Sequence, residues 1–410
     1  MNDELPATLA SSTLNPQPAT PSKVLVRVPN WVGDAVMALP ALRELRRIFE
    51  GSLVTLAARP WVAGLFEGEA LADTIIPFHD TSGLLNRARH FVSTAGQLRR
   101  ERFDYAVLLP NSFGSAVAAR AGGAKNIAGY PTDGRRRLLD HIIPFEPNHK
   151  KLHQVRYYLN IAAQIEGKLT GASRVDFEHC EPRLHVDETQ RDRARFLLER
   201  FGIKTVVGDR CPAVGKEQLA PDARPAQNEA DGEAAAAGGN VSLTTDSRRI
   251  LAINPGATNS TAKRWPAERF AETADRLSDE FQTVIVGTES DKEVSDKVAA
   301  LMSTRAVVLA GETSIGELKA VLACAELVVS NDTGAAHVSA ALGVPTIVVF
   351  GPTEHIATRP LAKHAAVVRH DVECSPCMLR ECPIDHRCMT RVQVEDVYRA
   401  ARQLLARAQN

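Results

Sequence analysis

The chain has 410 residues, of which 44% are hydrophobic, so it is long enough for two or three domains with sizeable cores. Lysine plus arginine and aspartate plus glutamate both number 49, and this lack of a basic excess argues against a nucleic-acid-binding protein. No apolar run approaches the ~20 residues that span a bilayer, and the N-terminal residues lack the basic and apolar regions of a signal peptide. These features predict a cytoplasmic protein whose contact with membrane lipid is at most peripheral.

The first half of the chain is predicted to be a polar tail followed by alternating strands and helices. Residues 1–22 are rich in Pro, Ser and Thr and predict a disordered tail. Apolar runs then predict strands at 23–29, 52–58, 74–78, 104–110 and 141–145. Residues 35–49 carry apolar side chains on one face and Pro40 in the first turns, as an amphipathic helix would. Such alternation is typical of parallel βαβ units.

Residues 205–248 interrupt this pattern. They are rich in Ala, Gly, Pro and charge and form a stretch far longer than an ordinary connection, which predicts a flexible linker or insertion at a domain boundary. Strands are predicted again at 249–255, 283–287, 306–310, 326–331 and 345–351, and helices at 268–281, 314–325 and 394–408. We therefore expect two Rossmann-like α/β domains, at 23–204 and 249–410, with a ligand between them at the carboxyl ends of the strands.

The segment Asn30-Trp31-Val32-Gly33-Asp34 follows the first predicted strand. Loops at this end of a first strand often face the ligand. Gly33 permits a tight turn, and Asp34 is a candidate general base. Alternatively, Asp34 only caps the helix that follows. No Gly-x-Gly-x-x-Gly follows the strand and the chain has no P-loop motif, which argues against a dinucleotide dehydrogenase or a P-loop NTPase.

A second motif, Asn331–His337, follows the predicted strand at 326–331. Asp332 or Thr333 could cap the helix that begins here. The small residues at 334–336 would let backbone amides approach an anion, and the positive end of a helix suits a diphosphate. Alternatively, this is an ordinary capped helix, although the small residues followed by His337 favour phosphate binding.

A third motif, Pro255–Pro266, follows another predicted strand and combines a Gly turn, several hydroxyls and Lys263. An ammonium group in such a loop could neutralise a phosphate as a compact charge. Alternatively, Lys263 is an ordinary solvated surface lysine.

Five stretches of the sequence together resemble one protein family. They are NWVGDAVMALPAL, LLPNSFGSA, NPGATNSTAKRWP, SNDTGAAHVSAALGVPTIVVFGPT and CSPCMLRECPIDHRCM. In this order they resemble the lipopolysaccharide heptosyltransferases of glycosyltransferase family 9, and PNSFGSA and the Cys-rich stretch are most like the heptosyltransferase II branch. The resemblance implies a GT-B fold, with two Rossmann-like α/β domains facing a cleft. It also implies inverting, metal-independent transfer of L-glycero-D-manno-heptose from ADP-heptose to heptosyl-Kdo2-lipid A in the inner core.

The resemblance also assigns roles to the motif residues. Asp34 would be the general base, and Lys263 would stabilise the leaving diphosphate. The implied donor-binding residues, all in the C-terminal half of the chain, are Thr258, Asn259, Lys263, Asp291, Thr313, Asp332, Thr333, Gly334, Ala335, Ala336 and His337. Asp291 matches the ribose-binding carboxylate by spacing, with Glu289 as its rival, and Thr313 falls where the family lines the adenine pocket. No cofactor besides the donor substrate is implied.

The implied acceptor is anionic, because Kdo carries carboxylates and lipid A carries phosphates. The implied acceptor-binding residues are Asn111, Ser112, Ser115, Arg135, Arg136 and Arg137. Arginine pairs with carboxylates in bidentate fashion, and Lys150 and Lys151 add a second basic cluster. Alternatively, these cations only form a solvated loop. The expected partners are therefore ADP-heptose and a lipopolysaccharide acceptor at the membrane surface, with no nucleic acid; the sequence identifies no protein partner.

Four cysteines, Cys374, Cys377, Cys382 and Cys388, have the spacing C-x2-C-x4-C-x5-C, and His386 lies among them. Four thiols could form a tetrahedral structural zinc site, but this spacing differs from a double C-x2-C. Alternatively, they are reduced thiols in a compact loop. The implied chemistry needs no metal, so any metal here would be structural.

Other functions remain open on the sequence alone. One is a heptosyltransferase with a different core acceptor, and another is a nucleotide-sugar epimerase of similar two-domain fold. A third is a non-catalytic sugar-nucleotide or lipid A binding protein, against which the joint presence of Asp34 and Lys263 argues.

Overall fold

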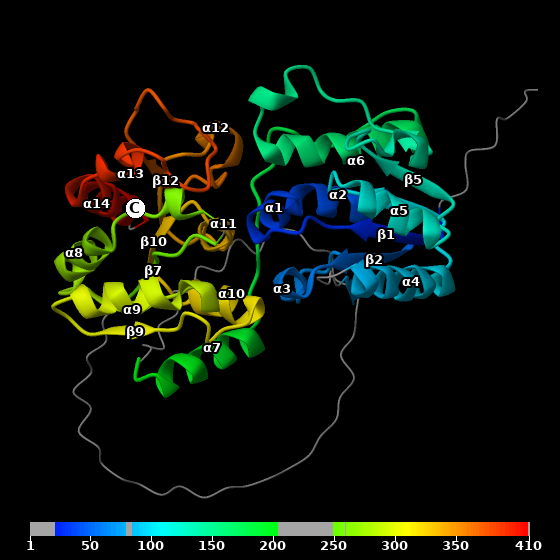
Figure 1. Ribbon diagram of the computed structural model, residues 1–410. Helices are drawn as coiled ribbons and strands as arrows, with labels where there is room; N and C mark the ends of the chain where they lie inside the picture. The colour runs from blue at the N-terminus through cyan, green and yellow to red at the C-terminus, as the bar shows by residue number, and fades with distance from the viewer. Residues whose placement is uncertain (1–20, 79–83, 204–248, 259, 409–410) are drawn as a thin grey trace, which may run out of the picture. The chain divides into compact units, whose positions relative to one another are not determined.

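The computed structural model describes residues 21–78, 84–203, 249–258 and 260–408. The predicted linker at 205–248 lies outside these ranges, as does the predicted tail except for residues 21 and 22. The described residues group into two units (Figure 1). Unit 1 takes those within 1–30, 38–60 and 70–180, and unit 2 takes those within 31–37, 61–69 and 181–410. No helix in the described ranges is both long enough and apolar enough to cross a membrane.

Unit 1 contains a parallel six-stranded sheet in the order β3-β2-β1-β4-β5-β6. The strands are β1 (Lys23–Arg27), β2 (Leu53–Ala58), β3 (Thr74–Pro77), β4 (Tyr105–Leu108), β5 (Asn126–Gly129) and β6 (His141–Ile142). Val24 of β1 aligns with Val54 and Tyr105 on either side, and all three are buried, as expected of strands covered on both faces. The strand order reverses between β1 and β4, so the sheet is doubly wound with its switch point there.

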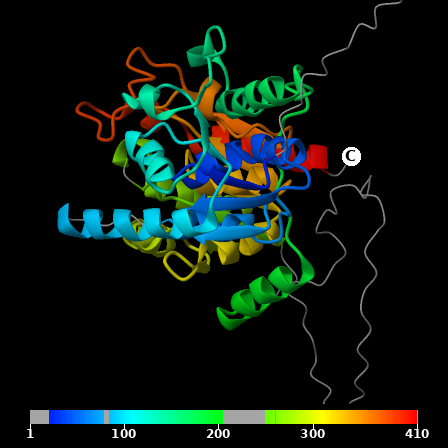
Figure 2. The same cartoon turned by 90° about the vertical axis from the view of Figure 1, so that its right-hand side faces the viewer.

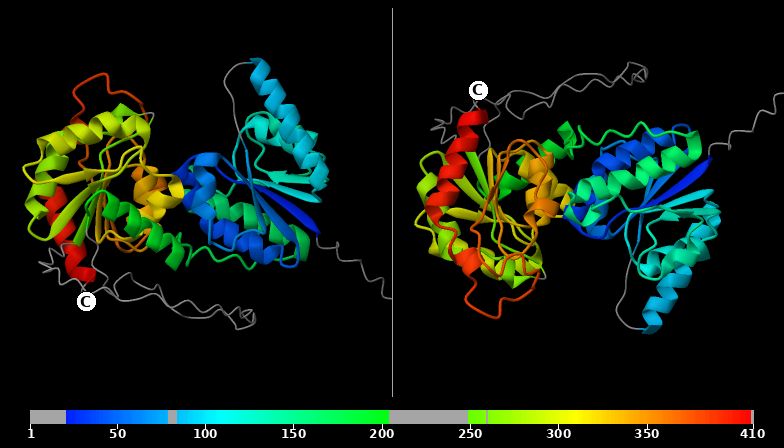
Figure 3. Two further views of the ribbon diagram at one scale, coloured as in Figure 1. Left: turned by 90° about the horizontal axis from the view of Figure 1, so that it is seen from below. Right: turned by 90° about the horizontal axis from the view of Figure 1, so that it is seen from above.

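Helices cover both faces of this sheet (Figure 3). On one face α2 (Leu39–Ile48) packs with α6 (Gln154–Thr170), and on the other α4 (Leu84–Glu101) packs with α5 (Phe113–Ala121). Figure 2 shows α4 from the side as a long straight helix. The short helices of this part of the chain are η2 (Arg135–Leu138) and η3 (His149–Lys151).

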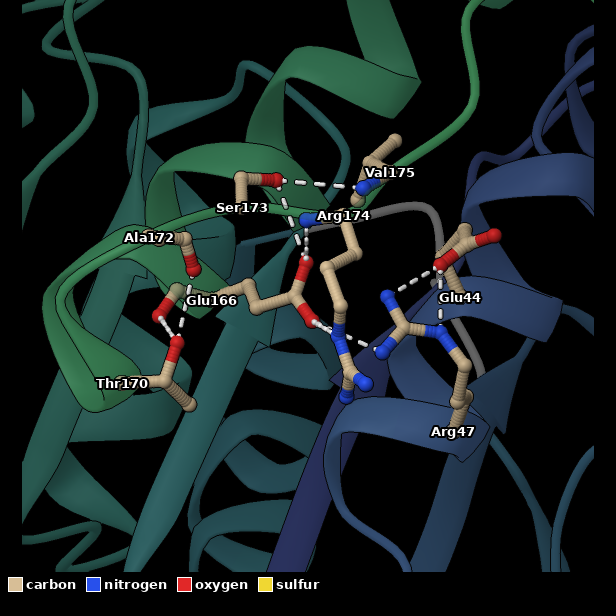
Figure 4. Close-up of polar contacts among 8 residues, drawn as sticks. All are labelled: Glu44, Arg47, Glu166, Thr170, Ala172, Ser173, Arg174 and Val175. Carbon is tan, nitrogen blue, oxygen red and sulfur yellow. Dashed lines mark hydrogen bonds and ion pairs between the residues drawn. The ribbon is translucent and has the colours of Figure 1, made fainter.

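The buried carboxylate of Glu166 on α6 forms an ion pair with Arg47 on α2 (Figure 4). Glu166 is only 2% exposed, and its carboxylate lies 2.7 Å from an Nη of Arg47. It also accepts hydrogen bonds from Ser173 Oγ at 3.1 Å and from the Arg174 backbone N–H at 2.7 Å. The bond from Arg47, opposed by burial and helped by the other two donors, lowers the pKa of Glu166 to about 2. Glu166 therefore stabilises the fold as an ionised group.

Unit 2 contains a second parallel six-stranded sheet in the order β12-β11-β10-β7-β8-β9. The strands are β7 (Arg249–Asn254), β8 (Phe281–Ile285), β9 (Ala306–Val308), β10 (Leu327–Asn331), β11 (Thr346–Val349) and β12 (Ala365–Val368). This is the same winding as in unit 1, and its switch point lies between β7 and β10. The expected pair of parallel α/β sheets is thus confirmed.

The helices of unit 2 also lie on both faces of its sheet. One face carries α8 (Ala267–Leu277), α9 (Lys292–Leu301) and α14 (Val394–Ala408), with Trp265, Phe270 and Met389 in the core beneath them. The other carries α7 (Glu188–Arg200), α10 (Ile315–Ala323) and α11 (Gly334–Ala341). The remaining short elements are α3 (Pro60–Ala63), α12 (His355–Thr358), α13 (Arg387–Thr390), η1 (Gly64–Phe66), η4 (Thr261–Lys263) and η5 (Glu289–Asp291).

A buried lysine holds the 61–69 segment within unit 2. The side chains of Lys319 on α10 and Glu69 are both fully buried, with 3.5 Å between Nζ and Oε1. Lys319 also donates to the carbonyl oxygens of Glu67 at 2.9 Å and Leu65 at 3.4 Å. The Glu69 carboxylate in turn accepts the backbone N–H of His185 at 2.7 Å. This ionic contact therefore joins three segments that are far apart in the sequence.

Most predicted elements are confirmed, although several have different bounds, one predicted helix is divided and two strands were not predicted. The predicted helix at 35–49 is two helices, α1 (Val32–Met37) and α2, because Pro40 at the start of α2 has no N–H to bond to the preceding turn. The strands β5 and β12 were not predicted. Both are four-residue strands whose sequences, NIAG and AAVV, are too short for a clear apolar pattern.

Candidate active site

The predicted donor-binding residues gather at one edge of the unit 2 sheet. Each follows the carboxyl end of a parallel strand: Lys263 after β7, Asp291 after β8, Thr313 after β9 and Asp332 after β10. Parallel strands end at the same edge, so these segments share one side of the sheet (Figure 1). Asn259 lies outside the described residues.

Lys263 and Asp332 form an ion pair at the switch point. Lys263 Nζ lies 2.8 Å from Asp332 Oδ2 and 3.3 Å from the Asp332 carbonyl oxygen. Thr353, which follows β11, donates its hydroxyl to the same Oδ2 at 2.7 Å. The Asp332 side chain is 8% exposed and that of Lys263 is 27% exposed, so the acid is nearly buried and the lysine is partly exposed. This arrangement holds a cation at the site with its charge partly balanced by one carboxylate.

Asn331 and Asn254 connect the loops around this pair. The sequence analysis named Asn331 as the first residue of a motif without giving it a role, and it did not single out Asn254. Asn331 Nδ2 donates to the carbonyl oxygens of Pro255 at 2.8 Å and Gly256 at 3.1 Å, while Asn331 Oδ1 accepts the Trp265 N–H at 3.0 Å. Asn254 Oδ1 accepts the Thr333 hydroxyl at 3.3 Å. These bonds fix both ends of the turn that carries Lys263. The signal available in the sequence was an Asn at the end of two adjacent parallel strands, where a side-chain amide can bond to neighbouring backbone.

The N-terminus of α11 has no side-chain cap from Thr333, although the sequence suggested that Asp332 or Thr333 could cap it. The Thr333 hydroxyl bonds to Asn254 instead, and the Asp332 carboxylate is engaged with Lys263 and Thr353. The first N–H groups of a helix have no partner within the helix, so they remain available to an anion. Ala335 and Ala336 behind them are buried and small.

The Asn30–Asp34 motif meets this helix end directly. Residues 31–37, which form α1, belong to unit 2 and pack on α11. A Cβ on Gly334 would lie 2.7 Å from the Cβ of Val32, and a Cβ on Gly33 would lie 3.0 Å from Cδ2 of His337. A side chain on Gly334 would therefore collide with Val32, and one on Gly33 would press against the His337 ring. Asp34 therefore directly follows, in the sequence, the residue that contacts the His337 ring. It lies in the first turn of α1 and not at its N-cap.

Two carboxylates compete for the predicted ribose position after β8. Asp291 is 3% exposed, and its Oδ2 accepts the N–H and hydroxyl of Thr288 at 3.0 and 2.7 Å. Its Oδ1 has no hydrogen-bond partner among the described residues, and the nearest cation is Arg264 at 3.9 Å. Glu289 is exposed, and its carboxylate lies against Gly311, where a Cβ would collide with it. Asp291 is thus a buried cap, and Glu289 is the accessible acid.

Thr258 follows β7 and Thr313 follows β9, the two strands on either side of β8, which precedes these acids. Thr258 is exposed, and its hydroxyl lies 3.5 Å from that of Thr288. Thr313 is partly buried and precedes Ser314, which begins α10 with a capping box. Both residues therefore lie on the same edge as Asp332.

The predicted acceptor residues Asn111, Ser112 and Ser115 lie in unit 1, after β4 at the switch point of that sheet. Asn111 Oδ1 accepts the Tyr157 hydroxyl at 2.8 Å. Ser112 caps α5 by accepting the Ser115 N–H at 3.3 Å, and Ser115 is buried. Of the three side chains, those of Asn111 and Ser112 are exposed.

The three predicted arginines differ in their surroundings. Arg135 is fully buried and donates to the carbonyl oxygen of Tyr130 at 2.8 Å, to that of Pro110, and to Ser115 Oγ at 3.0 Å. Burial lowers the pKa of its guanidinium. Arg135 therefore supports the Asn111 loop from inside the unit, whereas Arg136 and Arg137 are exposed. The second basic pair, Lys150 and Lys151, is exposed as well.

The cysteine loop (residues 374–388) lies beside the Lys263 turn in unit 2. Its four cysteines are free thiols. Burial, with smaller contributions from the other three thiols, raises the pKa of the Cys388 thiol to about 11. Across the described ranges, no three His, Cys, Asp or Glu side chains are grouped so that they could hold a metal ion.

Comparison with known proteins gives the family. A sequence model of glycosyltransferase family 9 (heptosyltransferase) matches residues 91–387. The lipooligosaccharide heptosyltransferase 2 of Campylobacter jejuni is 33% identical over 392 residues, covering 93% of this chain and 98% of the relative. The lipopolysaccharide heptosyltransferase 2 of Escherichia coli K12 is 27% identical over 352 residues, covering 85% and 88%.

The solved structures agree in fold. That of Escherichia coli ADP-heptose lipopolysaccharide heptosyltransferase II superposes with a TM-score of 0.72 at 23% identity, covering 95% of this chain and all of that one. Such a likeness supports the GT-B fold class, with two parallel α/β sheets, that the motifs implied. Because the family's sequence model matches most of the chain, and a relative one-third identical matches nearly all of it, the chain belongs to glycosyltransferase family 9, the heptosyltransferases.

Proposed function

We propose that this glycosyltransferase moves L-glycero-D-manno-heptose from ADP-heptose to heptosyl-Kdo2-lipid A in the inner core of lipopolysaccharide. The relatives that match almost the whole chain are heptosyltransferases of lipopolysaccharide or lipooligosaccharide. The observation that carries the proposal is the contact of two helix ends. The N-terminus of α11, beside Lys263, touches the turn that bears Asp34.

The donor diphosphate would bind at the N-terminus of α11. Its uncapped N–H groups and positive dipole end suit an anion, and Lys263 adds a full positive charge next to them. Thr258 and Asn259 would join this cradle from the turn after β7. Glu289 or Asp291 would bind the ribose hydroxyls, and Thr313 would line the adenine pocket. In this assignment the C-terminal domain, 249–410, holds the donor.

Asp34 would act as the general base. It takes the proton of the acceptor hydroxyl while that oxygen attacks the anomeric carbon, and the bond to the diphosphate breaks on the opposite face. The product then has the inverted anomeric configuration. Negative charge develops on the leaving ADP, and Lys263 with the amides of α11 would stabilise it in place of a metal ion. His337, next to Gly33, would orient the groups between base and donor.

The acceptor would bind to unit 1, the larger part of the predicted domain 23–204. Asn111 and Ser112 expose polar groups at the switch point of that sheet, and the exposed Arg136 and Arg137 could pair with carboxylates or phosphates of the acceptor. Arg135 would act only through the loop that it supports. Since this acceptor is a lipid, the protein would work peripherally at the cytoplasmic face of the membrane.

The reaction itself is tested by mass spectrometry of products formed from ADP-heptose with and without defined inner-core acceptors. We expect a mass gain of one heptose on heptosyl-Kdo2-lipid A, and no change in ADP-heptose alone. Altered ADP-heptose without acceptor would indicate epimerisation, and heptose on another core acceptor would change the assigned substrate. Activity should survive EDTA, and NMR of the product should show inversion at the anomeric carbon.

The base is tested with Asp34→Asn, which keeps the size of the side chain but cannot accept the proton. Turnover should fall by about 10²–10⁴-fold while ADP-heptose binding is retained, since a positioned base contributes about that much. Asp192→Asn, which changes an exposed carboxylate on α7, is the matched control and should leave turnover unchanged. Near-normal turnover in Asp34→Asn would remove Asp34 from this role.

A further inference from the structure

The cysteine loop touches two turns of the candidate active site, although the chemistry proposed above does not use it. One is the lysine turn, residues 260–263. The Ala262 N–H donates to the Arg380 carbonyl oxygen at 3.0 Å. His386 Nε2 lies 2.6 Å from the Ala262 carbonyl oxygen, and because a carbonyl only accepts, His386 is the donor. Both backbone groups of Ala262, the residue before Lys263, are thus bonded to the cysteine loop.

The second is the threonine turn, residues 351–353. Ser375 Oγ donates to the Gly351 carbonyl oxygen at 2.6 Å, and the Met378 N–H donates to the Pro352 carbonyl oxygen at 2.8 Å. Gly351 also lies so close to Cys388 that a Cβ there would be 3.0 Å from its sulfur. The cysteine loop therefore bonds to the two residues that precede Thr353.

These contacts link the lysine turn and the threonine turn twice, once through the Asp332 carboxylate and once through the cysteine loop. Lys263 and Thr353, at the tips of the two turns, both donate to Asp332 Oδ2. The cysteine loop joins the two turns from the other side. Lys263 is thus bonded through its side chain to Asp332, and the residue before it is bonded through its backbone to the cysteine loop.

His386 has an unusual backbone conformation that fits such a role. Its φ is 57°, in the left-handed region that, apart from glycine, asparagine, aspartate and histidine adopt most often. Glycine has no side chain to form this bond, and the side chain of asparagine is shorter than that of histidine. At this position, histidine combines the left-handed backbone with a side-chain hydrogen bond to Ala262.

We propose that the cysteine loop is a positioning element for Lys263, and that His386 is its main side-chain contact, acting as a positioning residue. The proposal rests on the proposed function, because it assigns the held lysine to the donor diphosphate. His386 does not touch substrate in this scheme. It fixes the turn so that Lys263 meets the developing negative charge without rearrangement, and such preorganisation is what makes a fixed charge effective in catalysis.

The test is a double-mutant cycle that combines His386→Asn with Lys263→Met in the full chain. Asparagine tolerates the left-handed backbone, so the variant should fold, and its melting temperature reports whether it does. We expect His386→Asn alone to lower kcat and ADP affinity by about tenfold, the loss of one well-placed hydrogen bond. In the Lys263→Met background, the same change should alter either quantity less than twofold, because its effect passes through Lys263.

The matched control is Asp385→Asn, next to His386 in the same loop. Asp385 is exposed and pairs with Arg387, so its loss should change neither kcat nor ADP affinity. If His386→Asn lowers kcat and ADP affinity equally in both backgrounds, its effect does not pass through Lys263 and the proposal is overturned. If Asp385→Asn causes the same loss as His386→Asn, the effect is a general one on the loop and the proposal is overturned as well. If the wild-type chain neither binds ADP nor transfers heptose, the proposed function fails first and this inference fails with it. Transfer by the wild type with an additive cycle would refute the inference alone.

Discussion

Replacing Glu166 with glutamine should weaken unit 1 in a pH-dependent way. The change keeps the shape of the side chain but removes the charge that Arg47 faces at 2.7 Å. Folding lowers the pKa of Glu166 from 4.5 to about 2, which corresponds to about 3 kcal/mol at neutral pH. Arg47 is 35% exposed, so solvent screens the pair, and we expect a loss of about 1–3 kcal/mol.

The pH dependence follows from the direction of the shift. Because the folded-state pKa lies below the unfolded one, the stabilisation is fully present above about pH 4.5 and is lost as the pH falls towards 2. The difference between wild type and Glu166→Gln should therefore be constant from pH 7 to 5. By about pH 3 it should be half or less of that value. Chemical unfolding followed by circular dichroism measures it, and the melting temperature should drop by roughly 2–10 °C at pH 7.

Glu44→Gln is the matched control, because Glu44 bonds to the same guanidinium from a more exposed position. Its loss should cost less than about 1 kcal/mol, as for other partly exposed pairs. The reasoning is refuted if Glu166→Gln is no less stable than Glu44→Gln. It is also refuted if the destabilisation stays the same down to pH 3, since Glu166 would then not act as a charge.

Three further predictions concern unit 2. Thr353→Val removes the hydroxyl that donates to the Asp332 carboxylate and should lower kcat/KM about 5–100-fold, whereas Thr353→Ser should stay within about threefold of wild type; equal activities of the two would contradict the assigned bond. Gly334→Ala puts a methyl group 2.7 Å from Val32 and should cost about 1–3 kcal/mol and lower donor affinity in calorimetry. Gly114→Ala, in a helix with open space around it, should be neutral or stabilising, and a similar loss there would argue against a steric cause. Lys319→Met leaves the Glu69 carboxylate buried without its cation and should cost about 3–5 kcal/mol in urea unfolding; an unchanged midpoint would mean that the pair contributes nothing.

The sequence predicted well which residues lie at the carboxyl ends of the strands. Strand runs such as 23–29 and 249–255 are strongly apolar, so the residues after them could be assigned to one edge without knowing the packing. Lys263 and Asp332 were both assigned to that edge on this ground, and the structure brings them to 2.8 Å. Which residues follow a strand is local information, and local information is what a sequence pattern carries.

Contacts between distant segments could not be predicted in this way. Nothing in its neighbourhood distinguishes Thr353 from any other threonine after a strand, because its role depends on Asp332, which lies on another strand. Arg135 stands in a run of three arginines that looks equally solvated, yet one of them is buried beneath the Asn111 loop. The fully buried Lys319 would be assigned to the surface on composition alone. Each outcome is decided by packing that only the tertiary structure reveals.

The docking of α1 on α11 has a consequence for synthesis on the ribosome. Val32 leaves the ribosome early, but Gly334, against which it packs, follows about 300 residues later. At about 5–20 residues per second, the nascent α1 would wait roughly 15–60 seconds for its partner. The contact between α1 and α11 can therefore form only after at least 334 of the 410 residues have been made.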